Sequence, residues 1–238
     1  MKIALIGYGK MGKTIERIAI ERGHEVVCKI DVDNQSDFES EAFASADVAI
    51  EFTAPSVAVS NYRKAWKAGV AVVSGTTGWN AQLPEIKAEI EANDYTLFWT
   101  SNFSLGVNIF FELNKYLAKI MNRFPNYNVE ISETHHIHKL DAPSGTAITL
   151  AEGILEHLDR KNEWVLGKKA TEKQIAIEAI REGEVAGIHT IKYGSDADSI
   201  EITHHSYNRE GLALGAVLAA EFTYGKKGFL NMQDMLKF

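Results

Sequence analysis

Groups that can carry protons and bind anions are concentrated in one short stretch, residues 130–147. They are histidines, a lysine, an aspartate and two hydroxyl side chains: His135, His136, His138, Lys139, Asp141, Ser144 and Thr146. The alternation of Val129 and Ile131 before them predicts the end of a strand. The Pro-Ser-Gly sequence at 143–145 predicts a turn that opens a helix. A helix N-terminus favours anions, because its N–H groups are free and the helix dipole is positive there. The pattern is therefore typical of a site for a carboxylate substrate that is protonated during the reaction.

The segment from His135 to Ala147, His-His-Ile-His-Lys-Leu-Asp-Ala-Pro-Ser-Gly-Thr-Ala, resembles the characteristic motif of the dihydrodipicolinate reductase family. That family reduces 4-hydroxy-tetrahydrodipicolinate to tetrahydrodipicolinate with NADH or NADPH and loss of water, on the diaminopimelate route to lysine. A hydride goes to C4 of the ring, and a proton neutralises the negative charge that develops. The resemblance covers nearly the whole chain and implies the same activity here.

The resemblance implies a role for each residue of the motif. We expect His135 to be the general acid, because an ordinary histidine pKa of about 6.5 suits a proton donor near neutral pH. Lys139 would be the second catalytic residue, placing a positive charge beside a substrate carboxylate. The expected substrate-binding residues are His136, Ser144, Gly145 and Thr146. Glu133 is expected to support these residues and not to react.

The N-terminal segment carries the pattern of a dinucleotide-binding loop. An apolar strand at residues 2–6 leads directly into Gly7-Tyr-Gly9-Lys-Met-Gly12, a helical pattern follows, and Asp31 lies 19 residues after Gly12. The first glycine permits a tight turn, the second lets the backbone approach a pyrophosphate, and the third allows the helix to pack closely on the strand. The alternative is a plain glycine turn. A plain turn would not explain why a strand precedes the glycines, a helix follows them and an acid ends the next strand.

Asp31 bears on the choice of cofactor. A carboxylate there would accept hydrogen bonds from the adenosine ribose and repel a 2′-phosphate. Many family members have an arginine after this acid and accept both cofactors, whereas this chain has Val32. We therefore expect a preference for NADH, with NADPH as a possible second cofactor if Lys10 or Lys29 reaches the phosphate.

Strands and helices alternate through the rest of the N-terminal half. Strands are expected at 25–30, 47–52, 70–73 and 95–99, and helices at 56–68 and 83–92. Ligands of such parallel sheets bind beyond the carboxyl ends of the strands. By resemblance, the cofactor-binding residues are Gly7, Gly9, Lys10, Met11, Gly12, Asp31, Phe52, Thr53, Gly75, Thr76, Thr77, Thr100, Ser101, Asn102 and Phe103. Taken alone, each later loop also fits an ordinary turn, because its residues are turn formers.

The pattern changes after residue 104. A long helix is expected at 106–123, a strand at 126–133, a helix at 144–159 that Ser144 caps, a loop at 161–173, and strands at 174–181, 187–194 and 199–207. A helix at 211–224 and the tail would return to the first domain. The predicted fold class is α/β: a Rossmann-like doubly wound parallel sheet plus a C-terminal α+β domain with an open mixed sheet. The expected domains are 1–104 with 209–238 for the dinucleotide, and 105–208 for substrate binding and oligomerisation.

The second sheet also bears on assembly. Isoleucines at 175, 177, 188, 191, 200 and 202 would make an exposed sheet face adhesive, so one face must be covered. The family forms homotetramers through this sheet, and the resemblance implies a homotetramer here.

Composition limits the other possibilities. The chain has 238 residues, 45% hydrophobic and 24% charged, which suits a globular protein of one large or two small domains. A net charge of −7 with no basic run disfavours nucleic acid and anionic membranes as partners. One cysteine, Cys28, excludes an internal disulfide, and no signal peptide or spanning segment is evident, so we expect a cytoplasmic protein.

Three alternatives have to be weighed. The first is a different nicotinamide-dependent dehydrogenase of an amino-acid pathway, which need not have the motif at 135–147. The second is an NADH-binding sensor without turnover, which the presence of both His135 and Lys139 disfavours. The third is a metal-dependent hydrolase. No cysteine or helical His-x-x-x-His pair completes a ligand set, so we expect no metal site.

Overall fold

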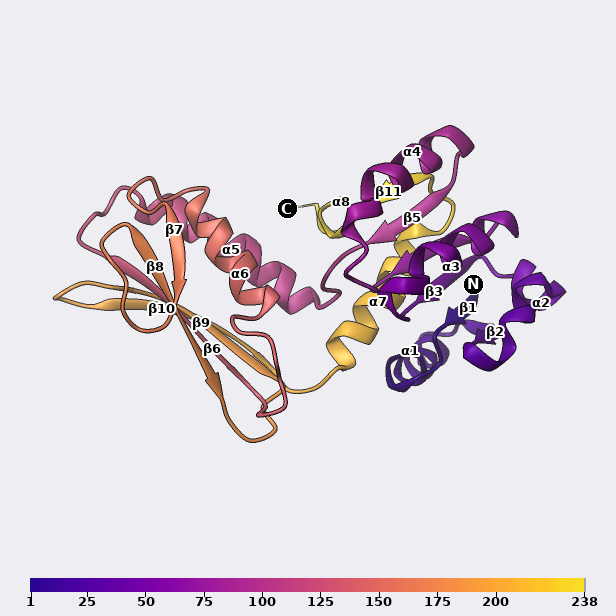
Figure 1. Ribbon diagram of the computed structural model, residues 1–238, viewed down its shortest axis with the longest axis horizontal. Coiled ribbons are helices and arrows are strands. Elements are labelled where there is room, and N and C mark those ends of the chain that lie inside the picture. Colours follow the sequence, from indigo (N-terminus) through magenta and orange to yellow (C-terminus); the bar gives the residue numbers. More distant parts are fainter. Residues whose placement is uncertain (238) are drawn as a thin grey trace. The chain divides into compact units, whose positions relative to one another are not determined.

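The structure is a computed structural model that describes residues 1–237. Its contacts divide the chain into two compact units (Figure 1). Unit 1 consists of Met1–Leu105 together with the residues from Glu210 onward, and unit 2 is Gly106–Arg209. Among the described residues, no helix is long and apolar enough to cross a membrane.

Unit 1 is built on a parallel sheet of strand order β11-β5-β4-β3-β1-β2. Its strands are β1 (Lys2–Ile6), β2 (Glu25–Ile30), β3 (Val48–Glu51), β4 (Ala71–Ser74), β5 (Thr96–Trp99) and β11 (Gly228–Leu230). The helices of this unit are α1 (Lys10–Glu21), η1 (Val32–Glu39), α2 (Glu41–Ala44), α3 (Pro55–Lys67), η2 (Asn80–Gln82), α4 (Leu83–Asn93), α7 (Glu210–Thr223) and α8 (Met232–Leu236). The strands are short continuous apolar runs, as expected for strands buried on both faces.

The two faces of this sheet pack into separate hydrophobic cores. Ile3 and Leu5 of β1 pack with residues of α1 and α7, whereas Ala4 and Ile6 pack with residues of α3 and α4. Successive side chains of a strand point to opposite faces, so this division shows helices on both sides. The predicted doubly wound parallel sheet is confirmed.

Unit 2 contains a mixed sheet of order β10-β9-β6-β8-β7. Its strands are β6 (Asn128–His135), β7 (Glu163–Leu166), β8 (Gln174–Arg181), β9 (Gly187–Gly194) and β10 (Ser199–Ser206), and its helices are α5 (Leu105–Met121) and α6 (Gly145–Leu155). β6 pairs in parallel with β8 and antiparallel with β9. The open mixed sheet of the prediction is therefore confirmed as well.

Helices of the same chain cover one face of this sheet. Residues of α5 and α6 pack with Ile175, Ile177 and Ile191, each of which is fully buried (Figure 1). Ile200 and Ile202 lie directly opposite Tyr193 and Ile191 in the β9–β10 pair, so they belong to the same face. Ile175, Ile177, Ile191 and Ile202 therefore need no partner subunit to cover them, because α5 and α6 provide the cover. Ile200 is 41% exposed, and Ile188 lies on the opposite face of the sheet.

Some local predictions are also wrong. The segment 161–173, predicted as a loop, contains the strand β7, in which three apolar residues follow Glu163 and the backbone pairs with β8. The helix α3 begins at Pro55, one residue before the predicted start at 56. The tail supplies strand β11 beside β5, a pairing that a three-residue apolar run does not reveal.

Candidate functional site

The glycine loop of unit 1 has the geometry that its sequence predicts. Gly7 has φ +93°, and a Cβ there would overlap the carbonyl oxygen of Phe52. A Cβ on Gly12 would overlap the carbonyl oxygen of Gly7. A Cβ on Gly9, in contrast, would meet nothing within 4 Å. The first and third glycines therefore permit close packing, and the second leaves its backbone open to a ligand.

A pocket of about 530 Å³ lies at this edge of the unit 1 sheet. It is lined by residues of the β1, β2 and β3 ends and of the helices that follow them: Ile6, Gly7, Gly9, Ile30, Asp31, Val32, Gln35, Phe52, Thr53, Ala54, Val57 and Asn61. Five predicted cofactor-binding residues, Gly7, Gly9, Asp31, Phe52 and Thr53, are among them. Lys10 and Met11 are the first two residues of α1. The lining is mostly apolar with a carboxylate at one end, which fits an adenosine group.

Asp31 is held in place by backbone donors. Its carboxylate accepts from the N–H of Tyr8 at 3.2 Å and of Val32 at 2.9 Å. Its own N–H donates to Asn34 Oδ1 at 2.7 Å, which completes a capping box at the start of η1. Lys29 forms an ion pair of 2.5 Å with Glu16 and is therefore engaged away from a cofactor phosphate.

A buried carboxylate connects the loops after β3 and β4. Glu51 is fully buried and accepts hydrogen bonds from Ser74 Oγ at 2.6 Å, Thr76 Oγ1 at 3.0 Å and the hydroxyl of Thr53. Burial raises its pKa although these hydroxyls act in the opposite direction. Thr76 also accepts from the N–H of Thr53 at 2.9 Å. The predicted residues Thr53 and Thr76 are thus brought together by hydrogen bonds.

The other predicted cofactor residues differ in exposure. Gly75 packs so closely on Phe52 that a Cβ would overlap the ring, whereas Thr77 is exposed. Thr100 Oγ1 accepts from the N–H of Asn102 at 3.2 Å, and Ser101 between them is exposed. Phe103 is only 1% exposed and packs on Phe52 and Phe98. Its ring belongs to the core, so any contact that Phe103 makes with a cofactor comes from its backbone.

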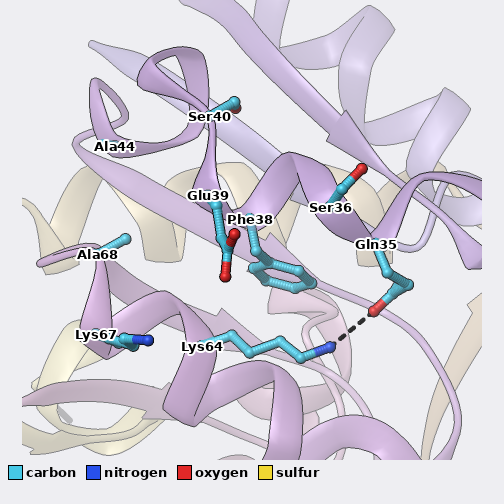
Figure 2. Close-up of a pocket in the computed structure, with 9 residues that line it drawn as sticks. All are labelled: Gln35, Ser36, Phe38, Glu39, Ser40, Ala44, Lys64, Lys67 and Ala68. Carbon is cyan, nitrogen blue, oxygen red and sulfur yellow. Dashed lines mark hydrogen bonds between the residues drawn. The ribbon is translucent and has the colours of Figure 1, made fainter.

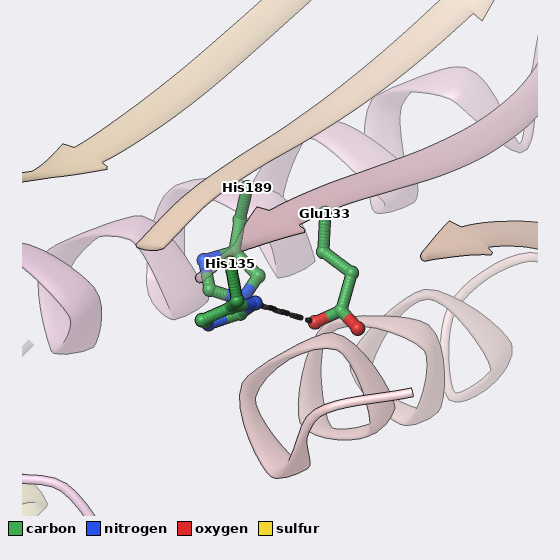
Figure 3. A group of neighbouring side chains, drawn as sticks. All are labelled: Glu133, His135 and His189. Atoms are coloured by element: carbon green, nitrogen blue, oxygen red, sulfur yellow. Dashed lines mark ion pairs between the residues drawn. The ribbon is translucent and has the colours of Figure 1, made fainter. Parts of the chain in front are cut away.

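In unit 2, strand register brings acidic and basic side chains together. Glu133 and His135 are two residues apart on β6 and therefore point to the same face. Glu133 lies opposite His189 of β9, and His135 lies opposite Arg181 of β8. Figure 3 shows the Glu133, His135 and His189 side chains converging. His135 Nδ1 is 3.4 Å and His189 Nε2 is 3.6 Å from Glu133 Oε2.

The start of α6 is attached to the same group. The N–H of Ser144 donates to Glu133 Oε1 at 3.0 Å, and Ser144 Oγ lies 3.1 Å from His189 Nε2. Ser144 Oγ also accepts from the N–H of Ala147, so its predicted role as helix cap is confirmed. Arg181 Nη2 donates to Glu133 Oε1 at 3.2 Å and to the carbonyl of Asp141 at 2.6 Å. Glu133 therefore fixes the strand end, the turn and the helix start relative to one another.

Electrostatics in this group differ from the sequence-based expectation. Burial, together with the charges of His189, Lys139 and Arg181, lowers the pKa of His135 to about 4, against the opposing effect of Glu133. The assumption of an ordinary histidine pKa near 6.5 is therefore wrong for this structure. Burial alone would raise the pKa of Glu133, but hydrogen bonds from His189 and Ser144 and the charge of His135 outweigh it and lower this pKa to about 2. Glu133 is ionised at neutral pH.

The remaining motif residues lie in the turn after β6 and at the start of α6. Lys139 Nζ donates to Asp141 Oδ1 at 2.8 Å, and its charge acts on His135. The His136 ring lies beside His138, with 5.9 Å between the ring centroids. Gly145 and Thr146 begin α6, and a Cβ on Gly145 would meet nothing within 4 Å. The helix start is therefore sterically open at Gly145.

The structure assembles a possible ligand set that sequence spacing does not reveal. Within residues 1–237, Glu133, His135 and His189 place one potential metal ligand each within 4.8 Å of one another. Arg181 already pairs with this carboxylate, and a cation disfavours a second positive charge nearby. The absence of a metal site stays a prediction.

Sequence reasoning assigned no role to Arg181 or His189. Both lie more than 40 residues from His135 along the chain, and only strand pairing brings them to Glu133 and His135. A signal was present in β9, where the buried residues Gly187, His189, Ile191 and Tyr193 alternate with half-buried ones. A histidine on the buried side of a strand needs a polar partner, and Glu133 is the partner here.

Models of one family match both parts of the chain. The model described as "Dihydrodipicolinate reductase, N-terminus" matches residues 1–103, and the one described as "Dihydrodipicolinate reductase, C-terminus" matches residues 106–236. A curated relative from Christiangramia forsetii, named 4-hydroxy-tetrahydrodipicolinate reductase, is 47% identical over 99% of this chain and 98% of its own length. A relative of the same name from Methanococcus vannielii is 34% identical over 99% and 98%.

Among solved structures, a dipicolinate-bound dihydrodipicolinate reductase from Paenisporosarcina sp. TG-14 is similar, with a TM-score of 0.78. It covers 98% of both chains at 24% sequence identity. An amine dehydrogenase from Mycobacterium smegmatis has a TM-score of 0.61 at 10% identity. These two likenesses support the fold alone.

Proposed function

The chain belongs to the dihydrodipicolinate reductase family, and we propose on that premise that it reduces 4-hydroxy-tetrahydrodipicolinate to tetrahydrodipicolinate in the synthesis of diaminopimelate and lysine. The observation that carries this proposal is the group formed by Glu133, His135 and His189 at the start of α6. It combines a buried proton carrier with open backbone donors, which a reduction of a dicarboxylate requires. Arg181 beside Glu133 disfavours the metal that a hydrolase would need at this group, and a sensor would not need the buried His135.

The nicotinamide cofactor fits unit 1. The open backbone at Gly9 suits a pyrophosphate, and the pocket of about 530 Å³ suits an adenosine. The anchored carboxylate of Asp31 suits the ribose of that adenosine. When bound, the reduced cofactor supplies a hydride to C4 of the substrate ring. Thr53 and Thr76, which the Glu51 carboxylate holds, keep two of the loops at this sheet edge in one conformation.

We assign proton delivery to His135. In the free protein its imidazole is neutral at pH 7, because its pKa is about 4. A substrate with two carboxylates brings negative charge that offsets the surrounding cations, so it raises the pKa of His135 and promotes its protonation. Glu133 and His189 hold the ring in position, and a protonated His135 then donates its proton as charge develops on the substrate ring.

Carboxylate recognition falls to the turn and the helix start. Gly145 and Thr146 present backbone N–H groups at the positive end of α6, and Thr146 adds a hydroxyl. Lys139 lies close enough for its charge to act on His135 and would pair with one substrate carboxylate. Ser144 is used as a helix cap and a partner of His189, so its contribution is to position the neighbouring N–H groups. His136 is the remaining proposed substrate contact.

A preference for NADH over NADPH follows from the position of Asp31. The carboxylate is anchored at the pocket edge, and the exposed residue after it is Val32 and not a cation. We expect kcat/KM for NADH to exceed that for NADPH by about tenfold. The 2′-phosphate of NADPH would find no cation at Val32 and would be repelled by the Asp31 carboxylate, and each effect is on the scale of one surface ion pair. Replacing Val32 with arginine should narrow the ratio. Steady-state kinetics with each cofactor measures it, and a wild-type preference for NADPH would contradict the assignment.

For assembly, we propose a cytoplasmic homotetramer joined through the face of the unit 2 sheet that α5 and α6 leave open. That face mixes hydroxyl, charged and apolar side chains, such as Thr190, Lys192 and Ile188. Sedimentation at micromolar concentration should give four times the mass of one chain. Introducing a lysine at Thr190 should weaken the tetramer, because it adds a second positive charge next to Lys192 on this strand. A stable wild-type monomer would overturn the proposal.

A further inference from the structure

A second pocket, of about 420 Å³, adjoins the cofactor pocket of unit 1. Its lining is shown in Figure 2 and consists of Gln35, Ser36, Phe38, Glu39, Ser40, Ala44, Lys64, Lys67 and Ala68. Gln35 lines both pockets. The two spaces therefore share one side chain, and a ligand in the first lies next to the polar groups of the second.

Lys64 has a defined place in this second pocket. It extends from α3, its Nζ donates to Gln35 Oε1 at 2.9 Å, and the same Nζ lies 4.8 Å from the centre of the Phe38 ring. Figure 2 shows its chain running beneath Phe38 toward Gln35, whereas Lys67 extends elsewhere. Lys64 is half-buried, and Lys67 is exposed.

Gln35 joins this lysine to the acid at the end of β2. The Gln35 amide donates from Nε2 to the carbonyl of Asp31 at 2.8 Å, while its Oε1 accepts from Lys64. The Gln35 side chain therefore connects the Lys64 ammonium group to the backbone carbonyl of Asp31. In a dinucleotide-binding sheet, the adenosine ribose lies at the acid after the second strand, with its 2′ oxygen toward the residues that follow.

We propose that Gln35 and Lys64 form the subsite for the 2′-phosphate of NADPH, so that this chain accepts NADPH as a second cofactor without an arginine after Asp31. The inference rests on the proposed function of unit 1. A phosphate at the shared wall would take the place of the Gln35 carbonyl as the acceptor for Lys64, and the Gln35 amide N–H would be a second donor. Glu39 also lines this pocket and opposes the lysines, which keeps the subsite weaker than one with an unopposed arginine.

The test compares binding of NADPH and NADH to three variants, by calorimetric titration without substrate and by kcat/KM in turnover. Lys64→Gln should weaken NADPH binding and lower its kcat/KM by about tenfold, and change the NADH values by less than about twofold. Lys67→Gln is the matched control, since it removes a lysine from the same pocket and helix but should leave both cofactors within about twofold. Lys64→Arg should retain NADPH binding.

Each result decides the proposal. Equal losses for NADH and NADPH in Lys64→Gln would mean that Lys64 supports the fold of the pocket, and no loss for either would place the phosphate elsewhere. Both outcomes overturn it. A failure of the proposed reaction would appear as absent turnover with both cofactors in the wild-type protein. The titrations would still report whether Lys64 discriminates the phosphate.

Discussion

Replacing His135 with glutamine should lower kcat by about 100-fold or more, within the range found for loss of a general acid. NADH binding should be unchanged, because His135 lies in unit 2 and the cofactor-binding residues in unit 1. Glutamine keeps a polar side chain of similar length but carries no proton near neutral pH. The measurement is the decrease of NADH absorbance, with substrate generated from pyruvate and aspartate semialdehyde by the preceding enzyme of the pathway.

The control is His157→Gln. His157 follows the C-terminal end of α6, whereas Glu133 and His189 contact the start of that helix, and it is not on the open sheet face. This variant should keep the wild-type kcat. If His135→Gln turns over at the wild-type rate, His135 is not the proton donor. If it loses turnover together with its native circular dichroism, the loss reflects folding, and His135→Asn would then be examined at lower temperature.

Glu133→Gln should lower the free energy of unfolding by about 3–5 kcal/mol, the usual result of breaking a buried ion pair from one side. The Glu133 side chain is fully buried, and Arg181 is left without its carboxylate. We also expect kcat to fall by about 10-fold to 100-fold, because His135 and the start of α6 lose the group that positions them. KM for NADH should not change. Urea unfolding and steady-state kinetics measure the two effects.

The pH dependence separates this role from simple packing. The pKa of Glu133 is about 2 in the folded protein and about 4.3 in an unfolded chain. Its charge therefore stabilises the fold fully above about pH 5, and this contribution is lost as the pH falls toward 2. The stability difference between the wild-type protein and Glu133→Gln should shrink over that interval. A constant difference would indicate that packing, and not charge, is what Glu133 contributes.

Glu130→Gln provides the matched comparison for this prediction. Glu130 is on the same strand, but it is exposed and points to the opposite face. Water screens the charge of this exposed carboxylate, so its removal should change stability by less than about 1 kcal/mol. Equal destabilisation by both variants would contradict the expectation that the buried charge of Glu133 contributes more to stability than an exposed charge on the same strand.

Local sequence determined the dinucleotide-binding part of this protein. Gly7 and Gly12 permit backbone approaches that a Cβ would block, Gly9 leaves its backbone open to a ligand, and Asp31 follows at the end of the next strand. Such constraints operate within a few residues or one βαβ unit, so they are visible in sequence order. The same holds for Ser144, whose side chain caps the helix that begins at the next residue.

Tertiary structure decided which groups surround His135. Arg181 and His189 reach it through the register of β8 and β9, and register depends on the packing of whole strands beneath α5 and α6. It also decided the pKa of His135, which burial and neighbouring cations set together.

The same distinction holds for Lys64 and the second sheet. In sequence, Lys64 and Lys67 are two similar lysines of one helix. Only Lys64 contacts Gln35 and Phe38, and folding alone creates that difference. Ile175, Ile177 and Ile191, which in sequence suggest a sheet face needing cover, are buried by helices of their own chain. The sequence by itself determined the motifs, their chemistry and the family, because these depend on nearby residues. Only the tertiary structure decided charge, burial and pairing, because these depend on residues far apart in the chain that folding brings into contact.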